Sequence, residues 1–135
     1  MVFNKTKSGL PLVPELGKSY THTRSFSRAD IAQFAGLSGD FGDHHTASDK
    51  PVMAQGLLVA SIVTKIGGDM NYIAHTMSFS MRRPVYEGQK ISGKVTVERL
   101  VKTPRRLKLD MRCECFDEKG ELVLSGSSQG MVWLQ

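Results

Sequence analysis

The second half of the chain alternates between apolar and polar residues with a period of two. Between Leu107 and Cys115 every second residue is apolar, and the residues between them are charged. Successive side chains of a β-strand point to opposite faces of a sheet, so this pattern predicts a strand with one buried face. Similar segments predict further strands at Tyr20–Phe26, His75–Val85, Lys90–Lys102 and Glu121–Leu134.

Helical spacing is found in the first half of the chain. Ser27, with Asp30 three residues later, forms a variant of the capping box that begins many helices. Gly39 stands where a left-handed residue can end the helix. The segment between them therefore predicts a short amphipathic helix, whose apolar residues recur at intervals of three and four: Ile31, Phe34 and Ala35.

A second helix is predicted at Val52–Ile66, where almost no polar face is left. A helix that is apolar on all sides is normally a buried one. Gly67 follows it and is a natural residue to end it. The intervening segment Asp40–Pro51 is polar and rich in turn-forming residues, so it predicts an irregular loop.

These elements predict an α+β fold in which an antiparallel sheet wraps around one buried helix. Asp117–Gly120 is a hairpin turn, and Gly126 and Gly130 mark possible bulges in the last strand. The 135 residues suit a single domain, residues 1–135, and the prolines at 11 and 14 predict a loosely ordered leader over residues 1–14. Unpaired sheet edges favour edge-to-edge dimerisation.

Charge and composition narrow the function classes. The net charge is +5, but the basic residues are scattered along strands rather than gathered on a helix. Nucleic-acid binding is therefore not expected, whereas attraction of a phosphate-bearing small ligand is compatible with the charge. The longest apolar run is far shorter than the roughly 20 residues of a membrane span, so no membrane association is expected.

Cys113 and Cys115 are the only two cysteines. Residues two apart in a strand share one face, so buried free thiols are expected rather than a disulfide framework or a zinc site. Free thiols favour a reducing, cytoplasmic location.

Acid–base groups concentrate in the predicted loop. Asp40, Asp43, His44 and His45 lie within six residues, and Gly56 stands near the start of the second helix. A carboxylate, an imidazole and the free N–H groups of a helix start are the parts needed to handle a thioester enolate. From the residues alone, Asp40 could equally cap the loop, and the two histidines could lie on the surface or bind a metal with Asp43. The absence of a fourth ligand at a telling spacing argues against a metal site.

Three segments resemble the MaoC-like family of (R)-specific enoyl-CoA hydratases. The stretch from Phe26 to Asp40 resembles the entry to the family motif Asp-x-Asn-Pro-x-His, and Asp40 and His45 match its Asp and His. The other two segments follow in the family's order: Met53–Ser61 resembles the Ala-His-Gly-Met-Leu segment that opens the central helix, and Arg83–Gln89 resembles the Arg-Pro-Val-x-x-Gly-Asp turn.

The resemblance implies a hotdog fold, assembled as a homodimer or a dimer of dimers, that hydrates trans-2-enoyl thioesters of CoA or acyl carrier protein, or runs the reverse dehydration, without a cofactor. It implies that Asp40 and His45 hold and activate one water, and that the N–H of Gly56 stabilises the thioester oxyanion. Ser61 matches a family serine near the site, and Gln55 and His44 are further candidate substrate-binding residues in this sequence.

The sequence also departs from the family pattern. Gly42-Asp43 replaces Asn-Pro, Gln55 replaces the usual histidine before Gly56, and the segment from His45 to Gly56 is shorter than usual. Because that segment helps to wall the acyl pocket, the departures bear on chain-length preference. They leave two alternatives open: a hotdog thioesterase, or a non-catalytic protein that binds acyl-CoA.

Overall fold

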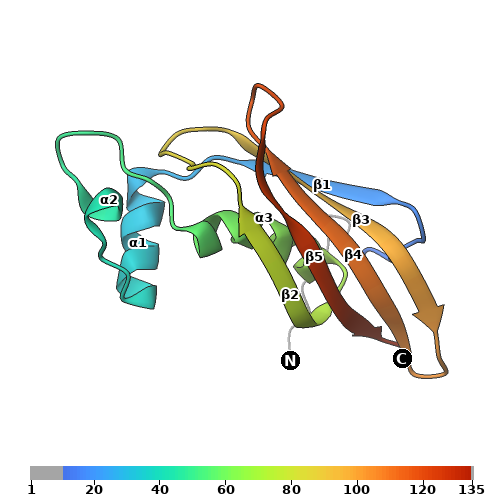
Figure 1. Cartoon of the computed structure of the whole chain (residues 1–135). Helices are drawn as coiled ribbons and strands as arrows, with labels where there is room; N and C mark the ends of the chain where they lie inside the picture. The colour runs from blue at the N-terminus through green and yellow to red at the C-terminus, as the bar shows by residue number, and fades with distance from the viewer. Residues whose placement is uncertain (1–10, 135) are drawn as a thin grey trace.

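A five-stranded antiparallel sheet curves along one side of a central helix, α3, in the computed structural model, which describes residues 11–134 (Figure 1). The strand order is β1–β3–β4–β5–β2, so the first two strands in the chain form the two edges. The α+β class expected from the sequence is confirmed. The strands are β1 (Ser19–Arg24), β2 (Ile73–Met81), β3 (Ile91–Lys102), β4 (Arg106–Phe116) and β5 (Leu122–Trp133).

The period-two pattern predicted the centre of the sheet correctly. Strand β4 buries the face that carries Leu109, Met111 and Cys113, while its charged residues point the other way. It pairs with β3 on one side and β5 on the other, and Gly120, at φ 79°, lies in the turn that joins β4 to β5. This inner face is the surface against which the central helix packs.

Helix α3 (Gly56–Asp69) lies against the sheet with Ile62 and Ile66 almost fully buried. Gly93 of β3 makes this approach possible, because a Cβ there would lie 2.3 Å from Cγ2 of Ile62. The apolar pattern had predicted a helix covered on all sides, and this prediction was wrong for a single chain. Leu57 is 68% exposed, and Thr64 is exposed as well, so one side of α3 stays open in a single chain.

The prediction that Gly67 ends this helix was wrong. The helix continues to Asp69, and the left-handed conformation falls instead at Asn71, with φ 56°. Gly67 is buried, and a Cβ at this position would lie 3.3 Å from the ring of Tyr72. The glycine therefore serves close packing at this point, not helix termination.

Helix α1 (Arg28–Ser38) begins and ends as the sequence indicated. The Ser27 side chain accepts a hydrogen bond from the N–H of Asp30, whose carboxylate accepts one from the N–H of Ser27. Gly39, at φ 81°, ends the helix. The loop expected to be irregular contains one helical turn, α2 (Asp43–Thr46), and α1 and α2 lie together beyond the end of the sheet, near the start of α3 (Figure 1).

Strand β2 is an exposed edge, and it ends at Met81 rather than continuing to Val85. Its bulge lies between Ala74 and Thr76, opposite Gly130, whereas Gly126 pairs without a bulge. Both glycines let the backbone of β2 come close. A Cβ at Gly126 would lie 1.9 Å from the carbonyl oxygen of Ser78, a distance that no side chain tolerates.

Of the leader expected over residues 1–14, residues 1–10 lie outside the described part of the chain. Residues 11–14 form no helix or strand, but the N–H of Leu12 donates to the carbonyl of Asp69 at 2.8 Å. The carbonyl of Val13 accepts a hydrogen bond from the hydroxyl of Tyr20. Within residues 11–134, no helix is both long enough and apolar enough to cross a membrane.

We predict opposite effects for alanine at two glycines. Gly126→Ala should lower the free energy of unfolding by about 1–3 kcal/mol, because the new methyl group collides with the backbone of β2. Gly36→Ala, on the exposed side of the last turn of α1 with no atom near the new methyl group, should raise it by about 0.5–1 kcal/mol. Urea unfolding followed by circular dichroism measures both. A harmless Gly126→Ala would contradict the close approach of β2.

We also predict that the buried thiols make stability fall at high pH. Burial raises the pKa of Cys113 to about 11 and that of Cys115 to about 12, from an ordinary value of 9.0. Above pH 9 the unfolded chain loses thiol protons that the native chain keeps, so the free energy of unfolding falls as the pH rises towards 11. Urea unfolding at pH 8 and pH 10 tests this, with the Cys113→Ala/Cys115→Ala variant expected to show a smaller fall. Equal falls in both proteins would exclude the thiols as the cause.

Candidate functional site

Asp40 and His45 face each other across the loop between α1 and α3. Oδ2 of Asp40 lies 3.3 Å from Nε2 of His45. The His45 side chain is only 5% exposed, whereas that of Asp40 is 51% exposed. The other oxygen of Asp40, Oδ1, accepts the N–H of Gly42 at 3.2 Å, so the carboxylate caps the loop and contacts the imidazole at the same time.

A backbone carbonyl fixes the tautomer of His45. Nδ1 lies 2.6 Å from the carbonyl oxygen of Met53. A carbonyl oxygen can only accept, so Nδ1 must carry the hydrogen. In the neutral ring, Nε2 then keeps its lone pair and turns it towards Asp40. The pair therefore presents two proton acceptors side by side, an arrangement suited to holding and deprotonating one water.

The start of α3 is fastened to this pair through Met53. The N–H of Met53 donates to the carbonyl of His44 at 2.8 Å, while its own carbonyl accepts from His45. Two hydrogen bonds thus join α2 to the residue three positions before Gly56. Sequence reasoning missed Met53 because its contribution comes from its backbone, which no side-chain pattern reveals.

Gly56 is the first residue of α3, so the helix begins four residues later than the predicted start at Val52. The helix has no side-chain cap, and its first internal hydrogen bond runs from the N–H of Val59 to the carbonyl of Gln55. The N–H groups of residues 56–58 are therefore left without a partner within the described chain, at the positive end of the helix dipole. A Cβ at Gly56 would lie 3.2 Å from the side chain of Met81, so only glycine leaves this corner uncrowded.

Gln55 connects the two main helices. Its amide nitrogen donates to the carbonyl of Ile31 at 3.0 Å, and the residue is buried. Its amide oxygen is buried without a partner among residues 11–134. The amide nitrogen of Gln55 is therefore occupied by a bond within the chain, whereas the amide oxygen is available to a ligand or a water.

His44 is packed against His45, with ring centroids 3.9 Å apart and planes inclined at 54°. A Cβ at Gly42 would lie 2.8 Å from Cε1 of His44. The glycine that replaces the Asn of the family motif is thus the residue that makes room for the second histidine. The departure at Gly42 is therefore coupled to His44, which stands at the variable position of the motif.

Ser61 lies one turn into α3, and its hydroxyl donates to the carbonyl of Leu58 at 2.5 Å. No contact in the described chain joins it to Asp40 or His45. Further along, an apolar cavity of about 90 Å³ lies between α3 and β2. Its lining includes Val63, Met77 and Phe79; the last two lie at alternate positions of β2, a spacing that could have indicated a shared face.

Metal-ligand geometry is not found in residues 11–134, where no three His, Cys, Asp or Glu side chains are grouped to hold an ion. The alternative of a metal held by Asp43 with the two histidines therefore has no support from the described residues. In His45, moreover, Nδ1 is already bonded to Met53, which leaves one nitrogen for any ligand.

We predict that nuclear magnetic resonance will find neutral His45 protonated on Nδ1. The hydrogen bond to Met53 requires this tautomer, which is the minor one in free histidine. Nitrogen-15 chemical shifts of the two ring nitrogens, measured above the histidine pKa, distinguish the tautomers. Exposed His75 serves as the internal reference, and protonation of His45 on Nε2 would contradict the assignment.

Comparison with known proteins supports the resemblance, although no profile of a known protein family matches the chain. An (R)-specific enoyl-CoA hydratase of Aeromonas caviae is 27% identical over 128 residues, which cover 84% of this chain and 92% of that protein. One from Rhodospirillum rubrum is 29% identical, covering 86% of each chain. A mitochondrial 3-hydroxyacyl-[acyl-carrier-protein] dehydratase of Arabidopsis thaliana is 28% identical, covering 82% of this chain and 72% of its own.

Solved structures agree with these sequence relatives. The (R)-hydratase from A. caviae superposes with a TM-score of 0.75 at 25% identity, covering 86% of this chain and 95% of its own. The MaoC-like dehydratase from R. rubrum has the same fold, with a TM-score of 0.70 at 18% identity over 90% of this chain and 94% of its own. The curved sheet and the central helix are those of the hotdog fold, and the chain's homologues in sequence are (R)-specific enoyl-CoA hydratases and an acyl-carrier-protein dehydratase.

Proposed function

We propose that this protein adds water to trans-2-enoyl thioesters to give (R)-3-hydroxyacyl thioesters, or catalyses the reverse dehydration. The observation that carries the proposal is the Asp40–His45 pair, with Nε2 held as a proton acceptor by the bond from Nδ1 to Met53. The homology to enoyl-CoA hydratases and to a 3-hydroxyacyl-acyl-carrier-protein dehydratase supports the reaction class.

In the hydration direction, one water lies beside the pair and donates hydrogen bonds to Asp40 and to Nε2 of His45. Nε2 takes a proton from this water while the oxygen of the water bonds to the β-carbon of the substrate. The electrons of the double bond move onto the thioester oxygen, giving an enolate. The proton then passes to the α-carbon and the thioester carbonyl re-forms, so one water is consumed and the pair returns to its starting state.

The enolate oxygen needs a donor, and the start of α3 provides one. The N–H of Gly56 has no partner among residues 11–134 and lies at the positive end of a 14-residue helix. Such a donor is strongest when it is fixed before the reaction begins, and loss of one typically raises a barrier by about 3 kcal/mol. Ser61, Gln55 and His44 remain our candidates for contacts to the substrate, with the buried amide oxygen of Gln55 the best placed to accept a hydrogen bond.

Assembly as a homodimer, or as a dimer of dimers, is part of the proposal. The edge strand β2 exposes Ile73, Met77 and Met81, and the neighbouring side of α3 exposes Leu57. A second copy paired along β2 would satisfy the unpaired edge and cover these apolar side chains. The cavity between α3 and β2 is the part of the described chain that suits an acyl chain.

The carrier of the acyl group is CoA or acyl carrier protein, as among the relatives. The net charge of +5 favours either phosphate-bearing carrier. The two free thiols favour a reducing compartment, and we propose the cytoplasm.

Replacing either member of the pair should abolish most of the activity. We expect Asp40→Asn and His45→Ala to lower kcat by roughly 100- to 10,000-fold, because each removes an acid–base group from the reacting water. The loss of enoyl absorbance in the ultraviolet, measured with short and medium acyl-CoA substrates, gives the rate. His22→Gln, on the opposite edge strand β1, is the control and should keep full activity.

Full activity in Asp40→Asn would refute the assignment of the pair. A thiol reagent added to the same reactions detects free CoA. Steady release of CoA without hydration would identify a thioesterase, and tight binding without any turnover would identify an acyl-CoA-binding protein.

A further inference from the structure

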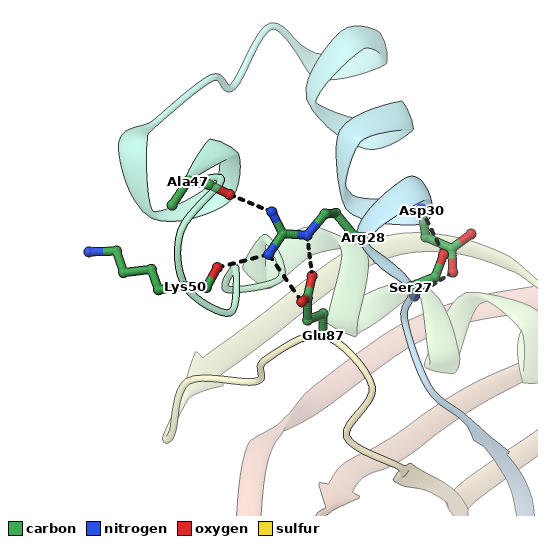
Figure 2. Close-up of polar contacts among 6 residues, drawn as sticks. All are labelled: Ser27, Arg28, Asp30, Ala47, Lys50 and Glu87. Atoms are coloured by element: carbon green, nitrogen blue, oxygen red, sulfur yellow. Dashed lines mark hydrogen bonds and ion pairs between the residues drawn. The ribbon is translucent and has the colours of Figure 1, made fainter.

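Arg28, the first residue of α1, joins three separate parts of the chain (Figure 2). Its Nε and Nη2 donate to the two carboxylate oxygens of Glu87, at 2.9 and 3.1 Å. Nη1 donates to the carbonyl of Ala47 at 2.6 Å, and Nη2 also donates to the carbonyl of Lys50 at 2.8 Å. Figure 2 shows the guanidinium between Glu87 on one side and the two carbonyls on the other, with the Lys50 side chain pointing away.

The two carbonyls belong to the segment that separates the candidate catalytic groups. Residues 47–55, the connecting segment, run from the end of α2, which carries His45, to the start of α3 at Gly56. Most of this segment has no regular structure, so its first half depends on contacts made by side chains from elsewhere. Arg28 is the side chain that binds its backbone in two places.

The turn that carries Glu87 is itself hydrogen-bonded to the connecting segment and to the chain just before α1. The N–H of Glu87 donates to the carbonyl of Val52, and the N–H of Ala54 donates to the carbonyl of Val85. The N–H of Gly88 donates to the carbonyl of Phe26, just before α1. The turn thus fixes the second half of the connecting segment through its backbone, and Arg28 fixes the first half through the side chain of Glu87.

This network differs from an ordinary surface ion pair, which contributes little because two long side chains must be ordered for one contact. Here the pair is bidentate, and the same guanidinium satisfies two carbonyls. Four of its five N–H donors point at acceptors in the structure, if each Nη2 hydrogen takes one. A lysine has one nitrogen and cannot reproduce this planar fork. With one N–H donor left, the guanidinium has little capacity to bind a phosphate group of the substrate.

We propose that Arg28 is a positioning residue for the reaction: through Glu87, Ala47 and Lys50 it holds the connecting segment so that His45 and the N–H of Gly56 keep their relative placement. The inference rests on the hydratase function proposed above. Small displacements of reacting groups are costly, since an error of about 1 Å can lower a rate 100-fold. The clamp formed by Arg28 and Glu87 therefore affects the rate of the reaction through the placement of these groups, and it makes no contact with the substrate.

The test compares Arg28→Gln and Arg28→Lys with Arg112→Gln. Arg112 is a matched control, because it too bonds to glutamates, at Glu98 and Glu114, and its side chain is 48% exposed against 46% for Arg28. We expect both Arg28 variants to lower kcat by roughly 10- to 100-fold with a much smaller change in KM. Arg112→Gln should keep kcat within about twofold, the change expected of a surface substitution.

Hydrogen exchange separates this inference from the proposed function. The N–H groups of Ala47, Met53 and Ala54 are bonded in the wild-type protein, and they should exchange faster in both Arg28 variants but not in Arg112→Gln. This measurement needs no substrate, so it decides whether the clamp exists even if the wild-type protein hydrates nothing. Unchanged exchange would overturn the clamp.

The kinetic outcomes decide the functional part. A fall in kcat in both variants, with faster exchange, supports positioning. Full activity in Arg28→Lys would show that only the positive charge matters, and full activity in both variants despite faster exchange would show that the clamp is structural alone; either result overturns the proposal. Glu87→Gln provides a second route to the same answer, because it weakens the pair from the other side and should lower kcat in the same direction.

Discussion

The burial of α3 is the constraint on which the rest of the structure depends. The face of the helix that carries Ile62 and Ile66 has to be removed from water, and the curved sheet is what covers it. The sheet meets that face through alternate residues of β3, β4 and β5, and Gly93 lets the helix approach closely enough for Ile62 to pack. Once the helix is fixed in this way, its first residue, Gly56, is fixed too, and the unpaired N–H groups at its start become a rigid feature of the molecule.

The remaining parts of the site are arranged around that fixed helix start by backbone hydrogen bonds. Met53 is bonded to α2 on one side and pairs with Tyr86 on the other. The turn after β2 is bonded in addition to Phe26, at the entrance to α1. Asp40, at the end of α1, and His45, in α2, therefore meet because both of their elements are tied to one turn. Residues far apart in the sequence are placed by a few short-range bonds rather than by a large interface.

Local sequence signals predicted local structure well. The capping box of Ser27 and Asp30 acts over three residues, and the left-handed Gly39 acts on its own helix, so both could be recognised without knowledge of the fold. The alternation in β4 was equally clear, because a strand with one buried face needs nothing but a period of two. The resemblance paired Asp40 with His45, and their side chains lie 3.3 Å apart in the structure, although their role in a reaction remains a prediction.

Where the predictions failed, the cause lay in long-range packing. Gly67 looked like a helix end, but Tyr72 packs against it and the helix continues. The apolar residues of α3 suggested complete burial, but a single chain leaves Leu57 exposed. The contacts of Arg28 could not be predicted from the sequence. Its partners lie 19, 22 and 59 residues away, and two of them are backbone carbonyls. No pattern in neighbouring residues encodes such contacts.

Two of the departures from the family motif, Gly42 and Gln55, take part in contacts around the site. Gly42 removes the side chain that would meet His44, and the ring of His44 then lies against His45. Gln55, in place of a histidine, uses its amide nitrogen to bond Ile31 and so joins α3 to α1. A shorter connecting segment leaves less backbone to order, and Arg28 binds two of its carbonyls. In this arrangement His45 is almost fully buried, with one ring nitrogen directed at Asp40 and the other bonded to Met53. Such a loop relies on being arranged before the substrate arrives, which is the condition under which a fixed carboxylate, a fixed imidazole and a fixed N–H group stabilise charge best.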